Sequence, residues 1–200
     1  MKALLIKDLM VLRGQAKALL AVFAVWFIIS FINGSGLFFI ALSVIFSILL
    51  PLTAVTADEK SGFERYAMTM PLTRSALAVS RYALGLLCCA AVTAVGVICA
   101  VVIGDEIGEA LFAALACFSL GLILMSVALP LVYKFGAEKA RILMTIVFVA
   151  VFLLIGLAAE RLGIEVDSLG GVTLLLPVFA LAVLAASVLI SLRIYAKREF

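Results

Sequence analysis

The chain has 200 residues, of which 67% are hydrophobic and 14% are charged. Soluble domains are about 45–50% apolar and about 25% charged, so this composition excludes an ordinary soluble protein. The formal net charge is +3, and the basic residues bracket apolar blocks instead of forming a cluster, which argues against nucleic acid as a partner. We expect one all-α integral membrane domain over residues 1–200.

The first segment, residues 1–17, mixes basic and apolar residues at helical spacing. Leu5, Leu9 and Leu12 fit one face of a helix, with four basic residues among them. Such a helix suits the membrane surface, where lysine and arginine meet anionic lipid. The alternative is a helix that simply continues the first membrane span into the cytoplasm. A cleavable signal peptide is disfavoured, because the next apolar block turns directly into another span.

Six apolar runs then follow that are long enough, or nearly so, to cross a bilayer. A hydrocarbon core about 30 Å thick takes roughly 20 helical residues. The runs are apolar on every side, which favours helices over barrel strands, whose residues alternate. The predicted spans are Ala18–Ile32, Leu37–Ala57, Tyr82–Ile103, Ala110–Tyr133, Ile142–Ala159 and Val172–Leu192.

The basic residues predict the orientation of these spans. Of the 15 lysines and arginines, 14 fall on one side, and only Arg161 falls on the other. The positive-inside rule places the basic side in the cytoplasm, together with both termini and the loop 58–81. The segment 160–171 is then an outer loop. We expect a multi-pass protein of the cell membrane.

Several kinds of chemistry are missing from the spans. No Asp, Glu, Lys or Arg falls inside a predicted span and the chain has no histidine, which argues against a proton-coupled carrier. No glycine precedes a lysine, so the chain has no phosphate-binding loop of the Gly-Lys-Ser/Thr type. We expect no catalytic residue, metal site or cofactor in this chain, and a separate subunit must supply any energy.

The polar residues inside the spans are mild ones. We expect the cysteines to act as small packing residues, and serine and threonine to bond to their own helix or a neighbouring one. These residues are Ser43, Ser47, Cys88, Cys89, Thr93, Cys99, Cys117, Ser119, Ser126, Thr145 and Ser187.

The loop after the second span is unusually apolar for a solvated connection. Phe63, Tyr66, Ala67 and Met70 are spaced for one helical face, and Pro71 then stops the helix. A short helix with one aromatic and one charged face suits a groove on a partner protein. A helix lying flat on the bilayer surface fits the same pattern, and the residues alone favour neither.

Two stretches resemble one known family. The opening Lys7-Asp8-Leu9 and the loop that starts with Asp58-Glu59-Lys60 resemble small type-2 ABC (ATP-binding cassette) exporter permeases. The resemblance extends through Tyr66-Ala67, Pro71-Leu72-Thr73-Arg74 and Ser80-Arg81-Tyr82, and the six-span layout matches over the whole length. Phe63 stands where the family has tryptophan. Members with this layout export bacteriocins, antibiotics and phenol-soluble modulins.

The resemblance implies a division of labour between subunits. The loop would hold a coupling helix that binds a separate ABC ATPase, which itself binds ATP and magnesium. A second permease, identical or related, would complete the membrane domain, and residues 1–17 would form an elbow helix. The implied partner-binding residues are Phe63, Glu64, Arg65, Tyr66, Met70, Pro71 and Arg74.

We expect hydrophobic or amphipathic cargo, such as peptides or antibiotics, because the spans are apolar and uncharged. The residues that bind it are not identifiable from the sequence. Two other classes of function are alternatives: a membrane scaffold or immunity subunit that moves no cargo, and an ion-coupled carrier that acts alone. Membrane lipid is a partner in each case.

Overall fold

A computed structural model describes residues 7–8, 10–11, 13–14, 16–63, 74–136, 138–140, 142–146, 149 and 170–197. No strand occurs among them, in agreement with the all-α prediction. Within these residues, 4 helices are long and apolar enough to cross a membrane, and Lys17–Asn33 is a shorter apolar helix. The five helices of the bundle among the described residues are α2 (Ala16–Asn33), α3 (Leu37–Ser61), α5 (Arg74–Ile103), α6 (Ile107–Phe135) and α8 (Gly170–Lys197).

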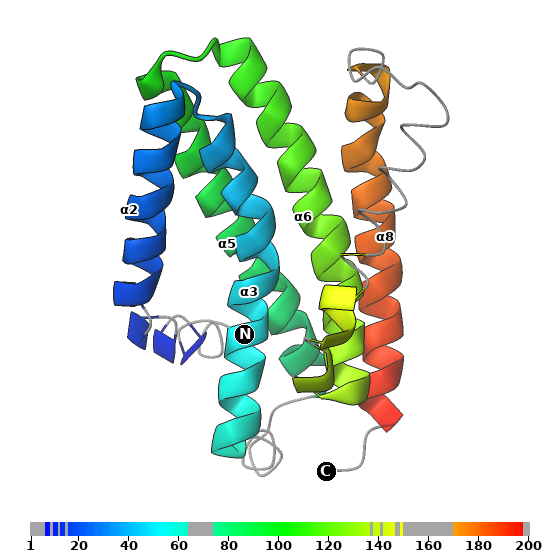
Figure 1. Ribbon diagram of the computed structural model, residues 1–200. Coiled ribbons are helices and arrows are strands. Elements are labelled where there is room, and N and C mark those ends of the chain that lie inside the picture. The colour runs from blue at the N-terminus through cyan, green and yellow to red at the C-terminus, as the bar shows by residue number, and fades with distance from the viewer. Residues whose placement is uncertain are drawn as a thin grey trace.

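These helices lie side by side as an elongated bundle (Figure 1). Helices α2 and α5 run in one direction, and α3, α6 and α8 run in the other. Helix α3 packs against α2, α5 and α6, while α8 packs against α6 and α5. We call the end that carries Lys60, Arg81 and Lys134 the basic end, and the end that carries Asp105 and Glu106 the acidic end.

Four predicted spans coincide closely with α2, α3, α6 and α8. The helix that contains the third predicted span is longer than that span, because α5 begins at Arg74 and not at Tyr82. The predicted loop 58–81 is therefore helical at both of its ends. The sequence interpretation stopped the span at the charge of Arg81, whereas the structure buries that side chain against acidic partners and the helix continues past it.

The direction of α6 and α8 bears on the fifth span. Both helices run from the acidic end to the basic end, so the chain between Phe135 and Gly170 starts at one end and finishes at the other. Residues 142–146 within it are helical. Most of the predicted span Ile142–Ala159 and of the outer loop 160–171 lies outside the described residues. The six-span count and the cytoplasmic termini stay predictions.

The described residues between 7 and 14 are helical, and they run crosswise to α2 (Figure 1). This change of direction favours the predicted elbow over a straight continuation of the first span. Its position at a membrane surface stays a prediction.

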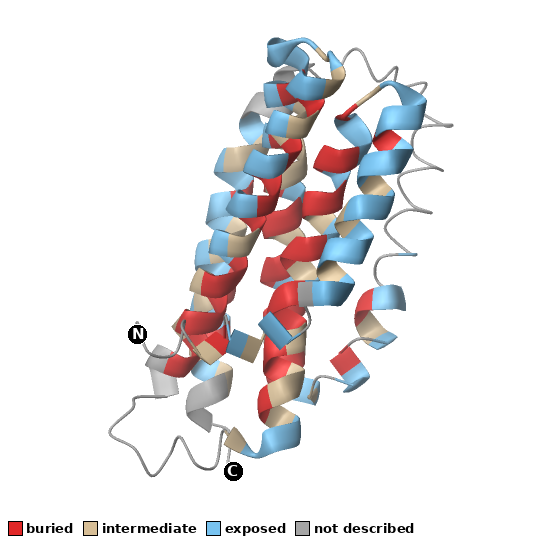
Figure 2. Ribbon diagram, turned by 90° about the vertical axis from the view of Figure 1, so that its left-hand side faces the viewer, coloured by how far each residue is buried: buried red, intermediate tan, exposed pale blue. Residues whose placement is uncertain are grey.

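Burial follows the pattern expected of a helical membrane protein (Figure 2). Phe39, Phe46 and Leu50 of α3 pack in a core cluster with Leu84 of α5. Phe23 of α2 stacks on this cluster, with its ring centroid 5.0 Å from that of Phe46. Large apolar side chains also cover the outside of the bundle, where lipid rather than water is the compatible solvent. The most exposed include Leu20, Phe31, Ile32, Val102 and Leu175.

The helices approach closely at the acidic end. The predicted turn between the first two spans is present, since α2 ends at Asn33 and α3 begins at Leu37. Gly36 donates its backbone N–H to Oδ2 of Asp105 over 2.8 Å. A Cβ atom added at Gly36 would overlap the Cα atom of Ala100, so α3 and α5 meet there with no room for a side chain.

Candidate functional site

The last turn of α3 lies within the predicted coupling segment, residues 58–74. Gly62 adopts the left-handed conformation (φ 65°), and its N–H points back to the carbonyls of Asp58 and Glu59. Glycine favours this conformation and it commonly ends a helix. Phe63 follows and is half-buried, with Nζ of Lys7 lying 3.8 Å from its ring centroid.

The other predicted partner-binding residues are not placed beside Phe63. Arg74 begins α5, but its side chain is outside the described part of the structure. Glu64, Arg65, Tyr66, Met70 and Pro71 also lie outside the described residues. The two helix ends that flank residues 64–73 both lie at the basic end of the bundle (Figure 1).

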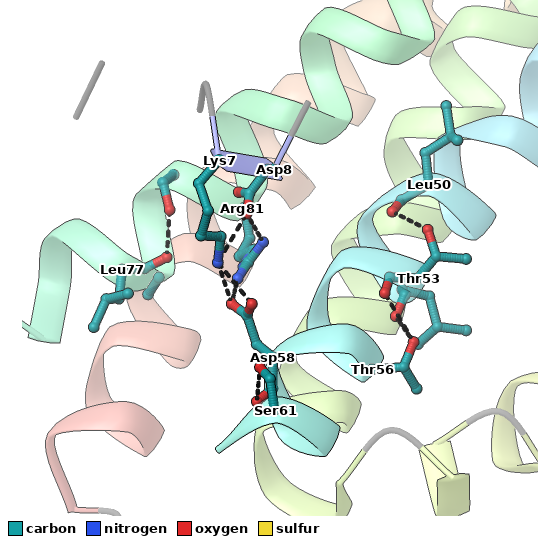
Figure 3. A network of polar contacts seen from close by, with 12 residues as sticks. Lys7, Asp8, Leu50, Thr53, Thr56, Asp58, Ser61, Leu77 and Arg81 are labelled. Carbon is teal, nitrogen blue, oxygen red and sulfur yellow. Dashed lines mark hydrogen bonds and ion pairs between the residues drawn. The ribbon is translucent and has the colours of Figure 1, made fainter. Parts of the chain in front are cut away.

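Four charged side chains meet beside this point, and we call them the four-charge cluster (Figure 3). Nζ of Lys7 donates to both carboxylate oxygens of Asp58, over 2.6 and 2.7 Å. Arg81 bridges the two acids, because Nη1 lies 2.6 Å from Oδ1 of Asp8 and Nη2 donates to Oδ2 of Asp58. Nζ of Lys7 also lies 3.1 Å from Oδ1 of Asp8.

The four-charge cluster is buried and electrically balanced. Asp8, Asp58 and Arg81 are 1%, 4% and 5% exposed, while Lys7 is partly exposed. Isolated charges in such positions cost several kcal/mol, whereas opposite charges in contact offset much of that cost. Two positive and two negative groups leave no net charge, so each member depends on the others.

Sequence reasoning missed this cluster. It placed the four residues in the elbow and the loop, outside the spans, and it predicted no contact among them. The one available signal was their presence in the stretches that carry the family resemblance. Charges of opposite sign at neighbouring helix ends give no indication of contact when the residues are 23, 51 or 73 positions apart in sequence, as in the pairs 58 with 81, 7 with 58 and 8 with 81.

A second polar group lies deeper between α5, α6 and α8. The hydroxyl of Tyr82 lies 2.7 Å from that of Ser187 and 2.6 Å from that of Ser191. Ser187 also donates to the carbonyl of Ser126 on α6. These contacts agree with the expectation that hydroxyls in the spans bond to neighbouring helices. Other hydroxyls, such as that of Thr93, bond within their own helix.

We predict that Tyr82→Phe destabilises the protein by about 1 kcal/mol, because hydrogen bonds between membrane helices contribute roughly 0.6 kcal/mol on average and at most about 1.7. Ser191 loses its hydroxyl partner in this variant. Unfolding in mild detergent, titrated with a denaturing detergent, measures the loss. Ser119→Ala is the control, since that hydroxyl bonds to Leu115 within α6. Equal stability losses in the two variants would contradict a role for the contact between helices.

Among the described residues, two hollows lie along one side of α3. An apolar one of about 280 Å³ is lined by Ile45, Leu49, Leu52 and Met144 among others. A more polar one of about 320 Å³ lies at the basic end. Its lining residues are Thr56, Glu59, Lys60, Phe135, Gly136, Glu138 and Lys139.

The cysteines take part in helix packing. Cys89 is fully buried, Cys88 and Cys99 pack against the α3–α5 cluster, and Cys117 packs near Ile40. Their place in these clusters agrees with their expected role as small packing residues. Among the described residues, no three His, Cys, Asp or Glu side chains lie together in a group that could hold a metal ion.

Comparison with known protein families identifies the family of this chain. The model of the family described as "ABC-2 family transporter protein" matches residues 3–196. The chain belongs to the ABC-2 transporter family. No curated protein and no solved structure matches it.

Family membership accounts for the architecture and bears on the role. ABC-2 proteins are the membrane components of ABC transporters, so this chain is a multi-pass transport protein and its family implies an ABC ATPase as partner. The match runs from the N-terminal segment to residue 196 in the last turn of α8, and therefore includes all the described helices of the bundle. The four-charge cluster lies within the matched region, at the basic end of this ABC-2 permease.

Proposed function

We propose that this chain is the permease subunit of an ABC exporter, and that its coupling segment, residues 58–74, docks on the ATPase subunit. The observation that carries the proposal is the position of the flanking helices. Helix α3 ends at Ser61 and α5 begins at Arg74, both at the basic end, which the positive-inside rule assigns to the cytoplasm. An ABC ATPase is a soluble cytoplasmic partner and meets the permease on that side.

The chemistry of the coupling segment supports docking into a groove. Phe63, Tyr66 and Met70 supply the apolar face, and aromatic side chains of this kind often dominate binding energy at protein interfaces. Glu64, Arg65 and Arg74 then set the register at the rim, where charge pairs contribute modestly to affinity. The partner ATPase binds ATP and magnesium, and a second permease chain completes the transporter.

The cargo we propose is hydrophobic or amphipathic. The apolar hollow between α3 and the helical residues 142–146 is lined by aliphatic side chains of α3 together with Met144 and Thr145. Ionisable Asp, Glu, Lys and Arg side chains of the described residues lie towards the two ends of the bundle. A site of this composition favours apolar surface over charged solutes, because burying an unpaired charge is costly. Peptides and antibiotics with apolar faces fit this chemistry.

Co-purification tests the proposal. The chain is expressed with its native genomic neighbours, purified in mild detergent, and assayed for ATP hydrolysis. We expect an ATPase subunit to copurify with the wild-type chain. Tyr66→Ala should lower the amount of ATPase recovered about tenfold or more, because loss of an interface anchor typically costs 2 kcal/mol or more. Phe63→Asp should act in the same direction, since it places a carboxylate in an apolar groove.

Ile107→Asp is the matched control for Phe63→Asp. Ile107 is 61% exposed at the acidic end, so this variant makes the same chemical change away from the proposed interface. It should retain the ATPase. A wild-type chain that purifies alone and without ATPase activity would refute the exporter assignment. Unchanged ATPase recovery in both coupling-segment variants would instead refute this docking site.

A further inference from the structure

The four-charge cluster connects three parts of the chain that are far apart in sequence. Asp58 lies in the last turn of α3, and Arg81 lies in the second turn of α5. Lys7 and Asp8 belong to the N-terminal segment, and Lys7 also lies over the ring of Phe63. The cluster therefore joins both flanks of residues 64–73 to the N-terminal segment.

This joint is stiffer than a set of surface ion pairs. Exposed pairs contribute about 0–1 kcal/mol and exchange readily with water. Here the carboxylates of Asp8 and Asp58 are almost fully buried, and Arg81 holds both of them with one planar guanidinium group. Moving one segment away from the others would leave a buried charge without its partner, which costs several kcal/mol.

We propose that Lys7, Asp8, Asp58 and Arg81 are positioning residues that hold the N-terminal segment, the end of α3 and the start of α5 as one rigid unit. A displacement of the coupling segment then moves α3 and α5 together. The coupling part of this inference rests on the proposed function, whereas the rigidity of the unit does not.

A charge-balanced double variant removes one connection without leaving an unpaired charge. Lys7→Met with Asp58→Asn separates α3 from the cluster and keeps the pair formed by Asp8 and Arg81. The matched control is Lys139→Met with Glu138→Gln, which removes an exposed pair of charges at the same end. Lys7→Arg alone keeps the positive charge and nearly the same side-chain length, so this single variant should behave like the wild type.

The first measurement tests rigidity in the permease by itself. Spin labels are attached through unnatural amino acids at Met10 and Lys60, which are both exposed, so that the native cysteines are retained. We expect one narrow distance distribution in the wild type, the control and Lys7→Arg. The double variant should give a distribution at least twofold broader. An unchanged distribution in the double variant would overturn the proposal.

The second measurement tests transmission in the complex with the ATPase. Labels at Lys60 and at Arg193, exposed near the end of α8, report movement of the unit relative to a helix outside it. Exchange of ADP for a non-hydrolysable ATP analogue should shift this distance in the wild type. The double variant should keep the ATPase bound, but its nucleotide-dependent change in distance should be at most half of the wild-type change. If the cluster only stabilised the fold, this change in distance would be the same in both proteins.

The outcomes separate the inference from the proposed function. If no ATPase copurifies, the exporter assignment fails while the distance between Met10 and Lys60 still tests the rigid unit. If the ATPase binds but the wild type shows no nucleotide-dependent shift, or the double variant shifts as the wild type does, the positioning role is refuted although the exporter assignment stands.

Discussion

Arg81→Met should destabilise the permease by about 3–5 kcal/mol. Breaking a buried ion pair by removing one partner has a cost of this size, because it leaves an uncompensated charge in the interior. Arg81 is 5% exposed and contacts two carboxylates, so its loss leaves Asp8 and Asp58 with Lys7 as their cationic neighbour. Unfolding titrations in mild detergent measure the loss.

Trp26 provides the signal for these titrations. It is the one tryptophan of the chain, and it packs against the core cluster between α3 and α5. Its fluorescence therefore reports separation of α2 from the bundle.

The combination of Arg81→Met with Asp8→Asn should recover most of the lost stability. This double variant leaves the pair formed by Lys7 and Asp58, whose contacts of 2.6 and 2.7 Å are independent of Arg81. Balanced or apolar replacements of buried ion pairs are often close to neutral, in contrast to single removals. Equal losses in the single and double variants would contradict the electrostatic account and indicate that the aliphatic part of Arg81 matters through packing.

Composition and periodicity were sufficient for most of the fold. Uninterrupted apolar runs predicted α2, α3, α6 and α8 because a helix in lipid must satisfy its own backbone and present apolar side chains on every face. Helix α5 begins at Arg74, eight residues before the predicted span that starts at Tyr82. A hydropathy rule ends a span at a charge, and it has no means of recognising that Arg81 is neutralised by partners from two other segments.

The candidate site was less accessible from the sequence. Residue spacing predicted that Phe63 belongs to an amphipathic helix, but it gave no indication that Lys7 lies over its ring. The four-charge cluster depends on contacts between residues separated by tens of positions, and a single sequence contains no information on which opposite charges pair. Glycine packing is equally hidden, because the same residue type ends α3 at Gly62 and permits close contact at Gly36.

Gly36→Ala should be the most disruptive conservative change at the acidic end, with an expected loss of about 3 kcal/mol. Overpacking in a dense interior costs roughly 1–3 kcal/mol and occasionally more. The added methyl group would overlap the Cα atom of Ala100 and lie 2.6 Å from its Cβ. Separation of α3 from α5 would also stretch the bond from Gly36 N–H to Asp105, and hydrogen bonds to charged groups contribute about 1.5–3 kcal/mol.

A graded series of glycine variants tests this packing, with unfolding titrations as the measurement. A Cβ at Gly108, in the first turn of α6, meets nothing within 4 Å, so Gly108→Ala should be neutral or slightly stabilising. At Gly96 the new atom would lie 3.1 Å from the Cα of Ile40, which predicts an intermediate loss. Adding Ala100→Gly to Gly36→Ala should recover only part of the lost stability, because the overlapping Cα atom belongs to the backbone and remains when Ala100 is replaced by glycine. Full restoration by Ala100→Gly would mean that α3 and α5 approach less closely at this point than their Cα positions indicate.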